Sequence, residues 1–289
     1  MQDPDVSFDS GGVHCAATVY RPSGATGVVG CVVMGNGITL TRKDGIPYYA
    51  QRFADAGFAV VAFDYRHWGD SGGEPRRTVS LRRQLEDWRA AVQYARGLEG
   101  VNPERVALWG MSLGGGLALM TAAADPRLAA TVALVPMADG LAAVAQPAPP
   151  GVTARLTWSI IRRALTRRPV TIPVAGAPGS FAVIAAPEAL PGFKRLASGN
   201  GWRNEVNAAG LLIPSPGFAP SGARLASGDR CWSSSASEME WSRFQRSKEL
   251  ALVRRRASSC ATRSTTSDAS GLNTSDISPA TSSSSFTDT

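Results

Sequence analysis

Apolar and polar positions in the first half of the chain predict strands and helices in alternation. Four short apolar runs have the length of buried strands, at residues 27–34, 58–64, 105–109 and 128–137. Continuous apolar runs of this kind are typical of strands that are covered on both faces. Ahead of them, residues 6–22 (VSFDSGGVHCAATVYRP) alternate in character around Ser10-Gly11-Gly12, which predicts a β-hairpin.

The segments between these runs have the character of helices. Residues 45–57 (GIPYYAQRFADAG) are amphipathic and stop at a glycine, and residues 112–124 (SLGGGLALMTAAA) favour a tightly packed helix. In residues 81–97 the apolar side chains recur at steps of three and four, on one helical face: Leu81, Leu85, Trp88, Val92 and Ala95. This alternation predicts an α/β fold with a doubly wound, mainly parallel sheet between two layers of helices.

The pattern weakens after residue 137. Residues 138–220 are rich in Ala, Pro and Gly, and we interpret them as a lid or cap-like insertion, the alternative being poorly ordered connection. Residues 221–289 end in a run of Ser and Thr that cannot bury enough surface to offset its chain entropy. We therefore predict a core at 1–137, a lid or cap at 138–220, and an aberrant, disordered tail at 221–289 from which the last strands of the sheet are missing.

Composition narrows the class of protein. The formal net charge is +7, but only three of the 30 basic residues are Lys, and no aromatic platform accompanies the run Arg254–Arg256, so we expect no nucleic-acid partner. The polar, acidic start does not resemble a secretory signal, and arginines interrupt the apolar stretch at 156–170, so we expect no membrane partner. The four cysteines lack metal-ligand spacing, and we expect a cytoplasmic location.

One short motif carries candidate chemistry. Gly110-Met111-Ser112-Leu113-Gly114 fits G-x-S-x-G between an apolar run and a predicted helix. A strand that turns into a helix within one or two residues exposes the serine hydroxyl, and flanking glycines let neighbouring backbone approach. Ser112 is therefore the candidate nucleophile. The alternatives are a glycine-rich helix start that serves packing and a phosphate loop, whose G-x-x-x-x-G-K-[ST] pattern does not occur.

Three backbone N–H groups are candidates for the two donors of an oxyanion hole. The N–H of Leu113 lies at the predicted start of the helix, beside any oxyanion formed at Ser112. We expect the second donor in the loop after the first apolar run, where the candidates are Gly37 and Ile38. The alternative interpretation of that loop is an ordinary turn.

Three motifs in this order resemble the α/β-hydrolase superfamily, most of all its dienelactone-hydrolase-like and serine-peptidase-like branches, over residues 4–137. They are the elbow at 110–114, GNGITLTRKDG at 35–45 and FDYRHWGDSGGEPR at 63–76. The resemblance implies a serine hydrolase of esters, thioesters or amides, or an acyl transferase, with a small acyl compound as substrate and no metal or organic cofactor. Two positions depart from the pattern, because Asn36 replaces the family's usual His and His67 its usual Gly.

The resemblance also reveals a missing base. The family's triad runs Ser, acid and His along the chain, yet both histidines, His14 and His67, precede Ser112. His14 belongs to the predicted hairpin. His67 follows the correct end of its strand, but we expect a loop residue without a catalytic role. Asp139 is one candidate for the acid, and the family's commoner position falls near 231–240, which does not read as a strand with an acid loop.

A shift of reading frame near residues 215–229 is our hypothesis for the tail and for both absences. Read from the third base of each codon, Asp229 to Trp232 permit Pro-Leu-Leu-Val, the start of an apolar strand. In the same way, Ala261 to Thr266 permit Tyr-Pro-Val-Asp-His-Phe, which resembles the family's histidine loop. The nucleotide sequence of this region tests the hypothesis.

The predicted function follows from the elbow and from the missing base together. We expect a serine hydrolase by descent, in which Ser112 forms the acyl-enzyme. Without a base its hydroxyl stays a weak nucleophile, so we expect poor activity from this chain. The alternative is a non-catalytic or defective pseudo-hydrolase that keeps only the pocket.

Overall fold

The computed structural model describes residues 2–137, 171–197, 201–207 and 232–234, with the single positions 151, 154, 158 and 161. The chain divides into two compact units, 1–253 and 254–289, and the second lies outside the described residues. The predicted tail at 221–289 also lies outside them, apart from 232–234, which form a strand of the sheet where the sequence analysis predicts none. The domain boundaries at 137 and 220 stay predictions.

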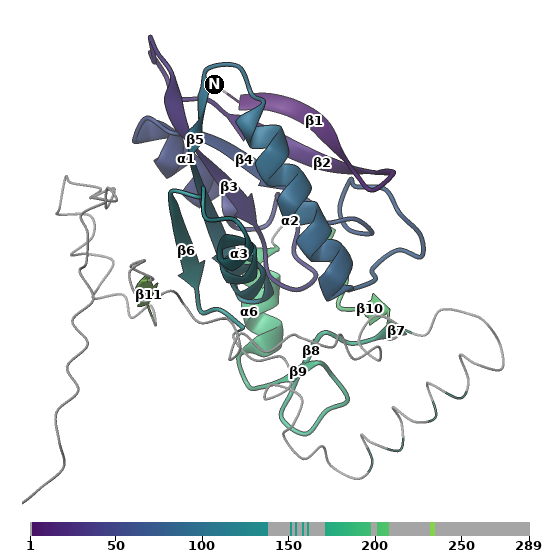
Figure 1. The fold of residues 1–289 in the computed structure, drawn as a ribbon. Coiled ribbons are helices and arrows are strands. Elements are labelled where there is room, and N and C mark those ends of the chain that lie inside the picture. The colour runs from purple at the N-terminus through teal and green to yellow at the C-terminus, as the bar shows by residue number, and fades with distance from the viewer. Residues whose placement is uncertain are drawn as a thin grey trace, which may run out of the picture. The chain divides into compact units, whose positions relative to one another are not determined.

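Among the described residues, a seven-stranded sheet forms the centre of the first unit (Figure 1). Its order is β1-β2-β4-β3-β5-β6-β11. β1 and β2 form the predicted antiparallel hairpin, and β3, β4, β5, β6 and β11 run parallel to one another. The predicted α/β fold with a mainly parallel sheet is therefore confirmed. The bounds are β1 (Gln2–Ser10), β2 (Val13–Tyr20), β3 (Val29–Gly35), β4 (Ala59–Phe63), β5 (Val101–Met111), β6 (Ala130–Leu134) and β11 (Trp232–Ser234).

Helices pack on both faces of the sheet, as the alternation of elements predicts. Successive strand residues point to opposite faces, so neighbours such as Val32 and Val33 of β3 belong to different apolar clusters. α1 (Ile46–Asp55) buries Ile46 and Ala50 in the cluster of Val32. α2 (Leu81–Arg96) and α3 (Leu113–Ala124) bury their apolar side chains in the cluster of Val33.

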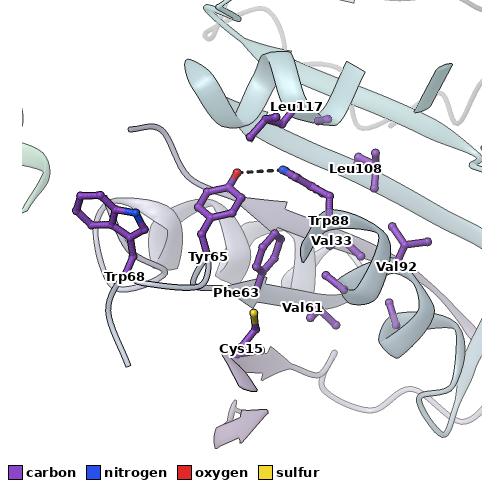
Figure 2. Close-up of a cluster of buried hydrophobic side chains, with 14 of the residues drawn as sticks. Cys15, Val33, Val61, Phe63, Tyr65, Trp68, Trp88, Val92, Leu108 and Leu117 are labelled. Atoms are coloured by element: carbon purple, nitrogen blue, oxygen red, sulfur yellow. Dashed lines mark hydrogen bonds between the residues drawn. The ribbon is translucent and has the colours of Figure 1, made fainter. Parts of the chain in front are cut away.

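Trp88 of α2 belongs to the cluster of Val33. Its side chain is fully buried, its ring meets Phe63 edge-on at 5.2 Å between centroids, and its indole N–H donates to the Tyr65 hydroxyl at 3.0 Å (Figure 2). Val92 and Ala95 are buried beside it, and Leu81 and Leu85 are partly buried, which confirms the predicted face of this helix.

β6 departs from the prediction of a strand covered on both faces. Val132 within the strand and Val135 just after it are exposed, whereas Ala133 between them is buried. Successive side chains point to opposite faces, and the helix that packs on β6 among the described residues is α3, on one face only.

A further set of short elements follows the core and is called the cap segment here (residues 171–197 and 201–207). It contains β7 (Thr171–Ile172), β8 (Ala175–Gly176), β9 (Ile184–Ala185), α6 (Ala189–Leu196) and β10 (Val206–Asn207). β7 pairs with β10, and β8 pairs with β9. The short helical pieces expected at 154–168 fall mostly outside the described residues. Within the part of the chain that is described, no helix combines the length and the apolar character needed to cross a bilayer.

Candidate active site

Ser112 occupies the single residue between a strand and a helix. β5 ends at Met111 and α3 begins at Leu113, and Ser112 has φ 53° and ψ −119°. A residue other than glycine at positive φ costs about 1–3 kcal/mol and persists only where its surroundings impose the conformation. Here the end of β6 imposes it, because Ser112 N donates to Leu134 O and Met137 N donates to Ser112 O, both at 2.9 Å.

The glycines around Ser112 are required by close contact between backbone segments. A Cβ on Gly114 would lie 2.3 Å from Asn36 O, and one on Gly110 would lie 2.3 Å from Gly114 O. A Cβ on Gly37 would lie 3.3 Å from that of Ser112. The turn after β5 and the end of β3 therefore touch directly, which brings the β3–α1 loop (residues 36–45) against Ser112.

Two of the three predicted oxyanion donors are left available by this geometry. Leu113 is the first residue of α3, so its N–H has no acceptor within the helix. Gly37 N instead donates to Asn36 Oδ1 at 2.8 Å. The N–H of Ile38 makes no hydrogen bond to any residue that the structure describes. Of the two candidates in the β3–α1 loop, the geometry favours Ile38.

Asn36, at the position where the family usually has His, organises the β3–α1 loop. Its Nδ2 donates to Thr41 O at 2.8 Å and to Asp44 O at 2.7 Å, so one side chain closes the loop on itself. Asp44 adds to this closure, because its Oδ2 accepts from both the backbone N and the hydroxyl of Thr41. The Asn36 side chain, which donates two hydrogen bonds and accepts one, therefore holds the β3–α1 loop beside Ser112.

The comparisons with known proteins agree with this arrangement. The X-Pro dipeptidyl-peptidase family (S15) matches residues 11–169, more than half of the chain. The chain belongs to the S15 family. The elbow, the β3–α1 loop and β3 to β6 all lie within the matched range.

Two known proteins are similar in sequence to this S15-family chain. The quorum-quenching protein AidA of Acinetobacter baumannii (strain MDR-ZJ06) is 39% identical over 213 residues, which cover 72% of this chain and 69% of AidA. The polyketide transferase GrgF of Penicillium sp. is 34% identical over 108 residues, only 37% of each protein.

The crystal structure of the α/β-hydrolase GrgF from Penicillium sp. sh18 superposes with a TM-score of 0.61 at 25% identity, covering 73% of this chain and 71% of that one. The α/β-hydrolase fold is thereby shown. Family and relatives place the chain among hydrolase and acyl-transfer enzymes of this type.

A buried ion pair, which the sequence analysis did not predict, attaches the β3–α1 loop to the loop that follows β4. The Arg42 guanidinium contacts the Asp64 carboxylate, Arg42 N donates to Asp64 Oδ1 at 2.6 Å, and Asp70 lies 2.8 Å from a second guanidinium nitrogen. Burial raises the pKa of Asp64, although Arg42 and two backbone N–H groups act in the opposite direction. Both residues lie within the quoted motifs, but nothing in their spacing indicates that they pair.

The remaining candidate site residues do not join Ser112. His14 is exposed on β2. His67 lies in the loop after β4, where its backbone pairs with Gly72 and Arg77 and its ring packs on Gly73, and none of the contacts described for it reaches Ser112. Asp139 lies outside the described residues. Within the described part of the chain, no three His, Cys, Asp or Glu side chains are grouped as metal ligands would be.

His67 is nonetheless unusual, because it is 3% exposed and neither ring nitrogen has a hydrogen-bond partner among the described residues. Burial lowers the pKa of His67, and the positive charges of Arg83 and Arg66 lower it further, while the adjacent backbone of Gly73 and the charge of Asp87 act in the opposite direction. The surroundings of His67 in the folded protein therefore favour the neutral imidazole.

This burial predicts a pH dependence of stability. Unfolded His67 has an ordinary pKa of about 6.5, so between the two pKa values the unfolded chain binds more protons than the folded one. The stabilisation by neutral His67 is present above about pH 6.5 and is lost as the pH falls through the lower, folded pKa. We expect the free energy of unfolding, measured with urea from pH 7.5 to 5, to fall more steeply for the parent than for His67→Asn. Asn tolerates the positive φ of 71° at this position. Parallel curves for the two proteins would contradict the prediction.

Proposed function

We propose that this S15-family chain is a serine hydrolase by descent that acts on carboxylic esters or related acyl compounds through an acyl-enzyme on Ser112. The observation that supports it most is the conformation of Ser112. A strained serine is retained between β5 and α3, with the β3–α1 loop packed against it. Strain of this kind is expected where a side chain must be presented for a reaction.

In the proposed reaction, Ser112 Oγ attacks the acyl carbonyl carbon and loses its proton. The carbonyl oxygen becomes an oxyanion, which the N–H groups of Leu113 and Ile38 stabilise. The bond to the leaving alcohol then breaks, the alcohol takes up a proton, and water releases the acid in a second, equivalent step. One oxyanion donor contributes a factor of about 10²–10³ to the rate in well-studied serine hydrolases.

The histidine base that is usual in such reactions is missing. Within these 289 residues no histidine follows Ser112. Loss of a triad member reduces kcat by about 10⁴-fold or more, so we propose a slow enzyme whose Ser112 is built for the reaction but poorly activated. The frame-shift hypothesis and a cytoplasmic location stay proposals with it, as does Asp139 as the acid. The alternative function is a pseudo-hydrolase without turnover.

The test uses the full chain with an added base. A fluorophosphonate probe is applied and the labelled peptide is identified by mass spectrometry, and release of nitrophenol from a nitrophenyl ester is followed with and without imidazole. We expect the label on the peptide that contains Ser112, and ester turnover that rises with imidazole concentration beyond its effect in buffer. Folded protein with neither labelling nor turnover would contradict the proposal and support the pseudo-hydrolase.

A further inference from the structure

The cap segment contacts the β3–α1 loop through one hydrogen bond between residues far apart in the chain. The indole Nε1 of Trp202 donates to the hydroxyl of Thr39 at 3.1 Å, across 163 positions of sequence. Thr39 directly follows Ile38, the proposed oxyanion donor. At the last residue of the loop, a Cβ on Gly45 would lie 3.3 Å from Leu196 of α6, so the cap segment approaches the loop at a second point.

Thr39 needs such support because its backbone is strained. It has φ 65°, and a β-branched residue in the left-handed region is a rare outlier. The side chain is buried, at 5% exposure, and Trp202 is the partner described for its hydroxyl. A change of φ at Thr39 would rotate the peptide group between Ile38 and Thr39 relative to the rest of the loop, and Ile38, whose N–H belongs to the preceding peptide group, would move with it. The direction of the Ile38 N–H thus depends on what holds Thr39.

Trp202 is itself held firmly within the cap segment. Its ring stacks on Phe193 of α6, with centroids 5.3 Å apart and planes inclined by 17°, and both rings pack against the core cluster. Two residues later, Asn204 accepts hydrogen bonds from the backbone N of Val174 and Ala175 through its Oδ1, and its Nδ2 donates to Ala175 O at 2.7 Å. The indole is therefore a fixed donor rather than a free surface group.

We propose that Trp202 is a positioning residue that acts through Thr39. Its indole N–H keeps Thr39 in the left-handed conformation, and this directs the Ile38 N–H toward the oxyanion formed at Ser112. The oxyanion hole is complete only while the cap segment is docked on the β3–α1 loop. The inference deepens the proposed function and rests on it for the role of Ser112.

The test compares Trp202→Phe, which keeps the stacked ring and loses the N–H, with Thr39→Val, which loses the acceptor. Trp68→Phe is the matched control, because Trp68 also donates its indole N–H, to Thr78 O at 2.9 Å in a different loop. Two quantities are measured in each variant: the rate of fluorophosphonate labelling at Ser112 and the amide hydrogen exchange of residues 37–41. Only the first requires a reactive serine.

We expect Trp202→Phe and Thr39→Val each to slow labelling by about three- to tenfold, the range for one hydrogen bond, with kcat for the ester lowered and KM unchanged. The double variant should resemble either single variant, because both remove the same bond. Exchange of residues 37–41 should become faster in all three and stay at the parental level in Trp68→Phe.

Failure of this inference differs from failure of the proposed function. A parent that cannot be labelled contradicts the role of Ser112, and the exchange of residues 37–41 still decides whether Trp202 holds the loop. A labelled parent whose rate is unchanged by Trp202→Phe overturns the positioning role, whatever the exchange shows. Unchanged exchange in Trp202→Phe and Thr39→Val overturns it as well.

Discussion

Replacing Ser112 with alanine is expected to abolish fluorophosphonate labelling and the imidazole-dependent release of nitrophenol. The label is a bond to the serine oxygen, and acyl transfer requires the same atom, so no slower route through Ser112 remains. Alanine keeps a Cβ at φ 53°, so the free energy of unfolding should stay close to the parental value. Ser112→Gly should also abolish labelling but increase stability by about 1 kcal/mol, because glycine adopts positive φ without strain.

The control for these variants is Ser80→Ala. Ser80 precedes α2 and its side chain makes no capping hydrogen bond, so its replacement removes one hydroxyl without loss of a described helix cap. Labelling and turnover should be unchanged in this variant. Labelling that persists in Ser112→Ala would contradict the role of Ser112 as the nucleophile. A decrease in stability in Ser112→Gly would contradict the backbone strain at this position.

Gly114→Ala is expected to disrupt the elbow and to lower the stability of the whole core. The added Cβ would lie 2.3 Å from Asn36 O and 2.5 Å from Gly35 O, and neither atom belongs to a side chain that could turn aside. Overpacking typically costs about 1–3 kcal/mol, and we expect the upper end of this range because two backbone segments must separate. Urea denaturation should show a lower midpoint, and Ser112 labelling should be lost in any protein that remains folded.

Gly97→Ala is the matched control for this substitution. Gly97 follows α2 with φ −89°, and a Cβ there would lie 3.6 Å from Tyr94 O, an ordinary contact. The urea denaturation midpoint of Gly97→Ala should be close to that of the parent. Equal midpoints for Gly114→Ala and Gly97→Ala would show that the elbow is less tightly packed than the distances indicate.

Local patterns were sufficient to predict most of the core. Continuous apolar runs predicted β3, β4 and β5, and the three- and four-residue steps around Trp88 predicted the buried face of α2. The elbow was predictable for the same reason, since a glycine–serine–glycine motif between a strand and a helix is a local signal. Exposure of Val132 was not predictable, because it depends on which other elements cover β6 rather than on the strand's own residues.

The contacts that hold the candidate site in place could not be predicted from the sequence, for the same physical reason. Arg42 and Asp64 pair across two loops, and Trp202 meets Thr39 from a distant segment, so no periodicity or spacing connects the partners. The sequence shows that Asn36 departs from a family motif, but its two hydrogen bonds within the loop depend on where Thr41 O and Asp44 O are placed. Sequence patterns report local chain geometry, whereas these contacts arise only when the elements pack together.

The hydrogen bond from Trp202 to Thr39 has a consequence for the order of events during synthesis. A ribosome adds about 5–20 residues per second, so the indole is made roughly ten to thirty seconds after the threonine that it holds. β1 to β3 precede Thr39 in the chain and β4 to β6 are made in that interval, so most of the sheet is synthesised before Trp202. A nascent chain can thus fold around Ser112 while the strained threonine still lacks its partner, so the β3–α1 loop would reach its final conformation only after Trp202 has been made.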